Sequence, residues 1–229
     1  MTCILLTGSS RGIGAATREM LEARGVDVIG HGRTAHDEST VGADMAGPQA
    51  PHILWEEALD RSGGAIDVLI NNAGLFAANP IESSDIAWLD AWEETIRVNL
   101  TSAAVLSRFA VRHWQDRGVP GRIVHIASRA GHRGDSPAHW HYAAAKGGML
   151  AMHKTIARAY AKDRICSFAI APGFTDTAPK SSGPGDYLES RGGAGLLADI
   201  PLGRVAEPEE IANIAVYLAL DAPESLTGA

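Results

Sequence analysis

The sequence predicts one α/β domain over residues 1–229, built on a doubly wound parallel sheet with helices on both faces. Three observations favour this fold class. Short apolar runs alternate with segments of helical periodicity, a glycine-rich turn joins the first run to the first helix, and neither a repeat nor a linker divides the 229 residues. Right-handed crossovers between parallel strands then place helices on each side of the sheet.

Five apolar runs have the length of buried strands in a parallel sheet. They are Ile4–Thr7, Val26–Gly30, Asp67–Ile70, Arg122–Ala127 and Ile165–Ala171. Apolar residues three or four positions apart predict helices between and after these runs. The first helix ends near Gly25, one covers Tyr142–Lys162, and the last has Pro208 in its first turn. Three of these helices have a clear apolar face. It consists of Ile13, Ala16 and Met20 in the first helix; of Val105, Leu106, Phe109, Ala110 and Trp114 in a long middle helix; and of Ile211, Ile214, Ala215 and Leu218 in the last helix.

Two segments lack a regular pattern. Arg33–Gly47 is short and polar, so we expect the crossover there to be abbreviated or to lack a helix. Residues 177–200 are rich in Gly, Ser and Pro, which is typical of a loop that moves over a site. We therefore expect a substrate lid at 177–200, with a disordered surface loop as the alternative.

Composition narrows the function classes. The formal net charge of −7 and the pI of about 5.7 argue against a nucleic-acid surface and a polybasic membrane anchor. No apolar run approaches the roughly 20 residues of a membrane span. Cys3 and Cys166 lie in apparent strands, and we expect buried, reduced thiols. Because no targeting signal opens the chain, we expect a cytoplasmic protein without nucleic-acid or membrane partners.

The turn after the first apolar run reads Thr-Gly-Ser-Ser-Arg-Gly-Ile-Gly. Glycines allow a pyrophosphate to approach the backbone, and a helix N-terminus offers free N–H groups and a favourable dipole. The turn is therefore expected to bind a dinucleotide, and a purely structural turn is the alternative. The expected contacts here are Gly8, Ser10, Arg11, Gly12, Ile13 and Gly14.

Tyr142 and Lys146 are four residues apart in a predicted helix and lie on one face of it. A tyrosine with an ordinary pKa of about 10 is a poor base at neutral pH. A neighbouring ammonium favours the phenolate and lowers that pKa. The pair alone is common on helix surfaces. Its weight comes from Ser128, which ends an apolar run where α/β sheets bind ligands, and from Asn99, which lies between two apolar residues.

Together these segments resemble the short-chain dehydrogenase/reductase family, of the 3-oxoacyl-carrier-protein reductase type. Its motifs occur in order: TGxxxGIG at Thr7–Gly14, NNAG at Asn71–Gly74, YxxxK at Tyr142–Lys146, PG at Pro172–Gly173 and a C-terminal stretch at Ile200–Tyr217. The resemblance covers essentially the whole chain. It implies a Rossmann fold and an oxidoreductase.

The resemblance implies a catalytic tetrad of Asn99, Ser128, Tyr142 and Lys146. Tyr142 would exchange a proton with the substrate oxygen, and Ser128 would hydrogen-bond the same oxygen. Lys146 would bind the nicotinamide ribose and lower the tyrosine pKa. Asn99 would help to hold the water that links the lysine to solvent, or would merely satisfy backbone groups. Hydride itself is carried by the cofactor.

The same resemblance implies the other cofactor contacts. Asp44 and Met45 would bracket the adenine, and Thr175 and Thr177 would lie at the nicotinamide half. The motif residues complete the set: Asn72, Ala73, Gly74, Pro172 and Gly173, with Tyr142 and Lys146.

The end of the second apolar run bears on the choice of cofactor. Gly32 takes the place of the carboxylate that binds the ribose of NAD, and Arg33 follows it. A guanidinium pairs with a 2′-phosphate, and Arg11 adds a second charge or only caps the turn. The sequence therefore favours NADP(H) over NAD(H).

Two features depart from the family pattern. Ser128 and Tyr142 are fourteen positions apart, one more than the commonest spacing, and the loop between them holds His132, His139 and His141. No carboxylate set accompanies these histidines, so we expect no metal site, and they should line the substrate entrance or face solvent. The chain ends at Ala229, before a strand that relatives usually have, so either a homodimer or a homotetramer is expected.

The sequence thus predicts an enzyme that transfers a hydride between NADP(H) and a small-molecule carbonyl or secondary alcohol. An NAD-dependent alcohol or sugar dehydrogenase is one alternative. A non-catalytic NADP(H)-binding regulatory protein is another, although it would not require Tyr142 and Lys146 together. A methyltransferase of similar fold leaves the NNAG and YxxxK segments unexplained. The substrate and the direction of the reaction stay open.

Overall fold

The computed structural model describes residues 2–177, 194–198 and 200–229. Six strands form one sheet in the order β3-β2-β1-β4-β5-β6, and every neighbouring pair is parallel. The order reverses between β1 and β4, which is where open α/β sheets leave a crevice for ligands. The strands are β1 (Cys3–Leu6), β2 (Asp27–Gly32), β3 (Thr40–Gly42), β4 (Val68–Asn71), β5 (Gly121–Ile126) and β6 (Ile165–Ile170).

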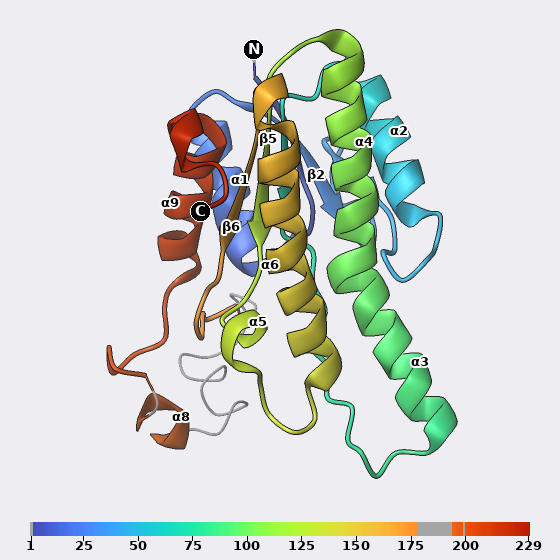
Figure 1. Cartoon of the computed structure of the whole chain (residues 1–229), viewed down its shortest axis with the longest axis vertical. Helices are drawn as coiled ribbons and strands as arrows, with labels where there is room; N and C mark the ends of the chain where they lie inside the picture. Colours follow the sequence, from blue (N-terminus) through green and yellow to red (C-terminus); the bar gives the residue numbers. More distant parts are fainter. Residues whose placement is uncertain (1, 178–193, 199) are drawn as a thin grey trace.

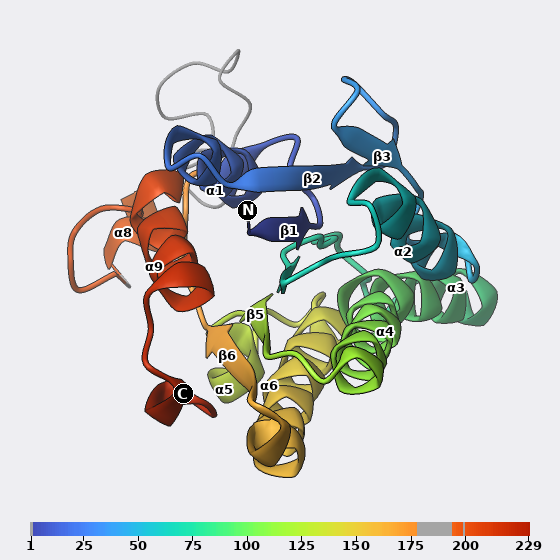
Figure 2. The ribbon, with the colours of Figure 1, turned by 90° about the horizontal axis from the view of Figure 1, so that it is seen from above.

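Helices cover both faces of the sheet (Figures 1 and 2). α1 (Gly12–Ala23) and α9 (Pro208–Leu220) lie on one face, and α2 (Ala50–Arg61), α4 (Ser102–Arg117) and α6 (Trp140–Tyr160) lie on the other. Each face has its own apolar core. One contains Phe168 of β6, beneath α9, and the other contains Trp114, a residue of α4 that packs on the sheet. The predicted doubly wound α/β class is therefore confirmed.

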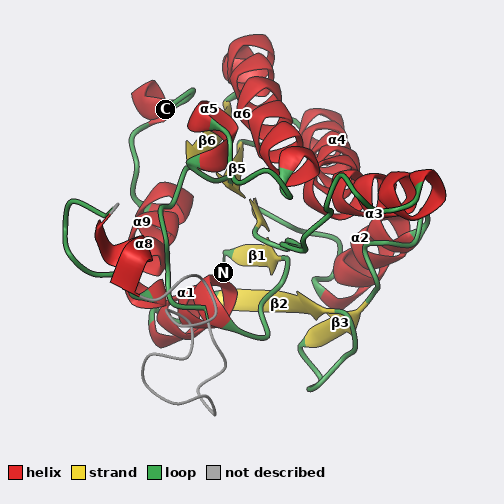
Figure 3. Ribbon diagram, turned by 90° about the horizontal axis from the view of Figure 1, so that it is seen from below, coloured by secondary structure: helices red, strands yellow, loops and turns green. Residues whose placement is uncertain are grey.

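The remaining elements extend this frame. α3 (Asp85–Ile96) passes through a π-helical turn, η1 (Arg97–Thr101), directly into α4, and Figure 1 shows the two helices end to end. Seen from below in Figure 3, α4 lies beside α6 on the same face of the sheet. α5 (Ala130–Arg133) and α8 (Ala194–Ala198) are short helices in the lower part of Figure 1. Two 3-10 turns, η2 (Ala161–Asp163) and η3 (Glu224–Leu226), complete the described elements.

The structure refines the predicted elements in a few places. β3 is a three-residue strand inside the polar stretch Arg33–Gly47, and the crossover before it has no helix, as expected. The prediction that Ile214 lies on the buried face of the last helix is wrong, because its side chain is 46% exposed. Ile211 and Ala215 of the same helix are buried against α1 and the sheet. Most of the predicted lid at 177–200 lies outside the described residues.

Both cysteines are buried and unpaired, as expected. Within the described ranges, no helix combines the length and the apolar character that a membrane span requires.

Candidate active site

Every residue predicted to be catalytic or to bind cofactor lines one groove of about 1170 Å³. The groove runs past the carboxyl ends of the strands, across the point where the sheet order reverses. It brings together segments that are far apart in the chain, from Gly8 in the first turn to Thr177 after β6. The predicted residues therefore share one site, and their individual roles stay predictions.

The phosphate turn is held by the end of β4. Thr7 Oγ1 accepts hydrogen bonds from the backbone N–H groups of Asn72 and Ala73, both at 2.9 Å. The Asn72 side chain donates to Thr7 O at 3.0 Å and to Gly8 O at 2.8 Å. A Cβ on Gly14 would lie 2.0 Å from Gly8 O, so this helix turn has no room for a side chain. Asn72, predicted as a cofactor contact, thus also fixes the turn.

His31 is a groove residue that the sequence analysis missed. It lies in β2, is 3% exposed, and its Nδ1 accepts a hydrogen bond from Gly8 N–H at 3.1 Å. Its Nε2 therefore carries the proton and donates to Ala43 O at 2.8 Å. Burial lowers the pKa of this imidazole, which keeps it neutral. A histidine between two glycines in a buried strand was the available signal.

Lys146 is buried at 3% exposure on the groove floor. Its Nζ donates to Ile126 O at 2.7 Å and lies 5.8 Å from the centre of the Tyr142 ring. Burial lowers the lysine pKa to about 8, so the ammonium still predominates at neutral pH. The helical spacing of four residues thus places a cation beside the phenol.

Asn99 is fully buried in the π-helical turn. Its Oδ1 accepts from Leu75 N–H at 3.1 Å, and its Nδ2 donates to Leu75 O at 2.9 Å and to Thr95 O at 3.0 Å. The side chain thus satisfies backbone groups, the simpler of the two expected roles. A Cβ on Gly74 would lie 3.0 Å from Asn99 Oδ1 and 3.8 Å from Lys146 Nζ, so both atoms approach the same point of the floor.

A layer of buried polar side chains lies behind Lys146. Asn71 Nδ2 donates to Ser107 Oγ at 3.1 Å and lies 3.3 Å from His125 Nδ1. Burial, reinforced by His153 and Lys146, lowers the pKa of His125 to about 3. Asn71 Oδ1, His125 Nε2, His153 Nδ1 and Ser167 Oγ have no hydrogen-bond partner within the described part of the chain.

Ser128 follows β5 and is half-buried. Its Oγ accepts from Ala130 N–H at 3.1 Å, which leaves its own proton available to a ligand. Beyond it, Phe76 packs edge-on against the Tyr142 ring at 4.8 Å and stacks on His139 at 3.9 Å. Sequence analysis did not identify Phe76, which follows the NNAG segment without a pattern of its own.

The segment after β6 forms one wall of the groove. Pro172 O accepts from Arg129 N–H at 3.1 Å, and the buried Thr175 forms a bridge with Ala206. Thr177 approaches the phosphate turn, because a Cβ on Gly12 would lie 2.9 Å from the Thr177 Cβ. Gly173 also lines the groove.

The opposite end of the groove carries two exposed arginines, Arg11 and Arg33. Neither guanidinium has an ion pair or hydrogen bond with another residue of the described ranges. Asp44, which is exposed, and Met45, which is buried, line the same groove. No side chain from the described residues caps the N-terminus of α1, so its first N–H groups are available to an anion.

The loop histidines differ from one another. His132 is exposed and His139 stacks on Phe76, but His141 is 1% exposed and neither faces solvent nor lines the groove, which corrects the expectation for it. Its Nδ1 accepts from Tyr142 N–H at 2.9 Å, and its ring lies 6.5 Å from that of Trp92 on α3. In the described ranges, no group of three or more histidine, cysteine or acidic side chains is arranged to hold a metal ion.

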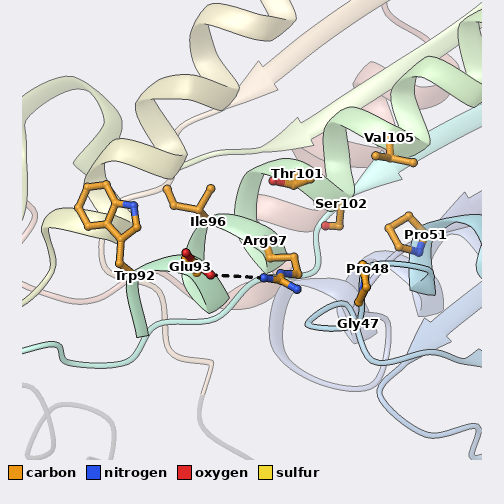
Figure 4. Close-up of a pocket in the computed structure, with 10 residues that line it drawn as sticks. All are labelled: Gly47, Pro48, Pro51, Trp92, Glu93, Ile96, Arg97, Thr101, Ser102 and Val105. Carbon is orange, nitrogen blue, oxygen red and sulfur yellow. Dashed lines mark ion pairs between the residues drawn. The ribbon is translucent and has the colours of Figure 1, made fainter. Parts of the chain in front are cut away.

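A second cavity, of about 390 Å³, lies between α3, α4 and the loop before α2 (Figure 4). Trp92, Ile96 and Val105 give it apolar walls, and an Arg97–Glu93 ion pair of 3.8 Å lies at its edge. It contains none of the predicted site residues.

A parallel sheet with a phosphate turn at α1 and a tyrosine–lysine pair in the same groove is the layout of a nucleotide-dependent α/β oxidoreductase. A family model described as enoyl-(acyl carrier protein) reductase matches residues 8–229. The 3-oxoacyl-[acyl-carrier-protein] reductase of Escherichia coli is 32% identical over 98% of this chain and 92% of its own length. The cis-4-hydroxycyclohexanecarboxylate dehydrogenase of Sinomonas cyclohexanicum is 34% identical, with the same coverage.

The 3beta-hydroxysteroid dehydrogenase 1 of Eggerthella lenta is 33% identical over 98% of this chain and 89% of its own length. Among solved structures, a 4-hydroxyisoleucine dehydrogenase complexed with NADH is similar with a TM-score of 0.82 and 25% identity, covering 100% of this chain and 94% of that one. The chain therefore belongs to the short-chain dehydrogenase/reductase family of oxidoreductases.

Proposed function

We propose that the protein interconverts a carbonyl and a secondary alcohol with NADP(H), and that Tyr142 is the general acid/base. The observation that carries this proposal is the buried Lys146 ammonium, 5.8 Å from the Tyr142 ring in the groove that also contains Ser128. Burying a cation costs folding free energy, so a buried lysine is a candidate for a functional role. Favouring the phenolate form of Tyr142 is such a role.

The groove has the features that a dinucleotide requires. The uncapped N-terminus of α1 suits a pyrophosphate, and the turn beside it is fixed by Asn72. Asp44 and Met45 line the groove and would contact the adenine, and Pro172, Gly173, Thr175 and Thr177 line it too and would contact the nicotinamide half. When bound, the nicotinamide would supply or accept the hydride.

The chain's own residues then handle the substrate oxygen. Ser128 donates a hydrogen bond to it, and Tyr142 gives up or takes the proton. Lys146 stabilises the phenolate between turnovers. Asn99 keeps the Leu75 backbone and the wide helical turn in place, so the floor beneath the lysine does not shift. The aromatic ring of Phe76 shields the phenol from water on one side.

NADP(H) is favoured because Arg11 and Arg33 line the groove without an ion pair to any described residue, and they would lie near a 2′-phosphate. NAD(H) is the second candidate, because the structurally similar 4-hydroxyisoleucine dehydrogenase was solved with NADH. The relatives' named substrates range from acyl-carrier-protein thioesters to a steroid, so no single substrate carries over.

The test is oxidation of NADPH and NADH with a panel of ketones, repeated with Tyr142→Phe. We expect the variant to lose about 10²- to 10⁴-fold in kcat with unchanged NADPH affinity. Tyr217→Phe, which removes the hydroxyl of an exposed tyrosine on α9, is the matched control and should stay active. Turnover unaffected by Tyr142→Phe would refute the mechanism, and NADPH binding without any turnover would favour a regulatory protein.

We also propose a cytoplasmic homodimer or homotetramer that associates through α4 and α6. Exposed apolar side chains lie beside these helices, at Ile86 and Leu89 of α3 and at Trp140 of α6. Sedimentation analysis tests this, and a monomer at micromolar concentration would contradict it.

A further inference from the structure

Arg129 is a cation of the groove that the proposed chemistry does not use. It directly follows Ser128 and lines the same groove as Ser128 and Tyr142. Its guanidinium carbon lies 3.8 Å from the centre of the Phe174 ring. It forms no ion pair or side-chain hydrogen bond with any other residue that the structure describes.

Both partners of this stack are fixed by the backbone. Arg129 N–H donates to Pro172 O at 3.1 Å, and Phe174 O accepts from Ala206 N–H at 2.9 Å. α5 is pressed against α6, since a Cβ on Gly131 would lie 2.8 Å from the backbone of Lys146 and Gly147. The guanidinium is therefore held at a defined place, and its N–H groups donate to none of the residues that the structure describes.

A half-buried arginine that is held by an aromatic ring and has no ion pair with a described residue is well suited to bind an oxyanion, because its fork of donors matches a carboxylate or a phosphate. Asp135 and Glu94 also line the groove, but neither forms an ion pair with it. The half-buried Arg129 is therefore the groove arginine that lies next to Ser128 and could pair with an anion there.

We propose that Arg129 binds an anionic group of the substrate, so that the protein acts on carbonyl or alcohol compounds that carry a carboxylate. This rests on the proposed function and adds a substrate class to it. The carbonyl would lie on Ser128 and Tyr142, and the carboxylate on Arg129 against Phe174. A phosphate of the cofactor is the other anion that could reach this arginine, and the test separates the two.

The test pairs 2-, 3- and 4-oxo acids with their methyl esters, which share a carbon skeleton but lack the charge. Each is assayed with NADPH for kcat/KM, and its binding to the NADP-saturated protein is measured by calorimetry. We expect the wild type to prefer the acids and Arg129→Met to lose about 10- to 100-fold on acids and little on esters. Arg129→Lys should retain part of the preference, because it keeps the charge without the fork.

Arg133→Met is the matched control, because Arg133 is an exposed arginine of the same short helix that does not line the groove. It should leave both preferences unchanged. Equal use of acids and esters by the wild type, with equal binding, would overturn the proposal while leaving the proposed oxidoreductase intact. If Arg129→Met binds NADPH more weakly but retains the preference for acids, the arginine binds the cofactor and not the substrate. That result would also overturn the proposal. Acid-selective binding that Arg129→Met abolishes would support it even without turnover.

Discussion

The two ends of the groove are built from different parts of the chain. At the end proposed to bind the nucleotide, which we call the nucleotide end, backbone groups and the exposed side chains of Arg11 and Arg33 line the groove. At the catalytic end, the side chains of Asn99 and Lys146 are buried and hydrogen-bonded to backbone carbonyls. The nucleotide end therefore depends on close backbone packing, whereas the catalytic end depends on polar groups removed from water.

This difference separates stability from activity. Glycines at the nucleotide end permit the fold itself, so changing them should destabilise the protein. A buried ammonium at the catalytic end opposes folding, so removing it should not lower the stability. It should abolish activity, because Tyr142 loses the neighbouring cation.

Lys146→Met gives the largest expected effect. We expect kcat to fall by about 100-fold or more, because the phenolate loses its neighbouring cation. The free energy of unfolding at pH 7 should be unchanged or higher. In the wild type, the lysine pKa is lowered from 10.5 to about 8, so between these values the unfolded state binds more protons and stability rises with pH. Denaturant unfolding of Lys146→Met between pH 8 and 10 should lack this rise; a large destabilisation would contradict the comparison.

Gly14→Ala tests the nucleotide end. The new Cβ would lie 2.0 Å from Gly8 O and 2.5 Å from Asn72 Nδ2, so the turn must shift. We expect destabilisation by about 1–3 kcal/mol in thermal or denaturant unfolding, together with weaker NADPH binding. Glu19→Ala, an exposed change in the same helix, should be nearly neutral. Unchanged stability of Gly14→Ala would refute the packing argument.

Arg33→Ser should change affinity alone. Because Arg33 is exposed and its guanidinium has no partner in ranges 2–177, 194–198 and 200–229, its removal should leave the melting temperature unchanged. We expect about a 10- to 100-fold increase in KM for NADPH and little change for NADH. Equal changes for both cofactors would argue against recognition of a 2′-phosphate by this residue.

The smallest expected effect at neutral pH concerns the layer behind Lys146. The pKa of His125 is lowered to about 3, so below about pH 6.5 the unfolded state binds a proton that the folded state does not. The free energy of unfolding therefore decreases as the pH is lowered. His125→Asn should flatten this fall by about 1.4 kcal/mol per pH unit between about pH 6 and 4. The exposed His132→Asn is the control, and an equal slope in wild type and His125→Asn would contradict the prediction.

The same contrast explains what the sequence revealed. The phosphate turn and the Tyr142–Lys146 pair are local patterns with fixed spacing, and the structure brings them to one groove as predicted. The sequence does not indicate His31 or Arg129 as site residues, because each is placed in the groove by a residue that is distant in the chain. His31 contacts Gly8, and Arg129 contacts Phe174. β3 was missed because three residues in a polar stretch carry no periodicity, and Ile214 was misplaced because one helix face does not show which neighbour covers it.

The wide turn Arg97–Thr101 has one more consequence, which is angular. A π-helical turn closes its hydrogen bonds five residues apart instead of four, so it contains one residue more than an α-helical turn. The turn thereby absorbs the extra residue without changing the phase between α3 and α4. A residue inserted into the regular part of α3 after Trp92 has no such turn to absorb it, and it would rotate Trp92 by about 100° about the helix axis, away from His141. A length change in α3 should therefore be far more damaging than most substitutions.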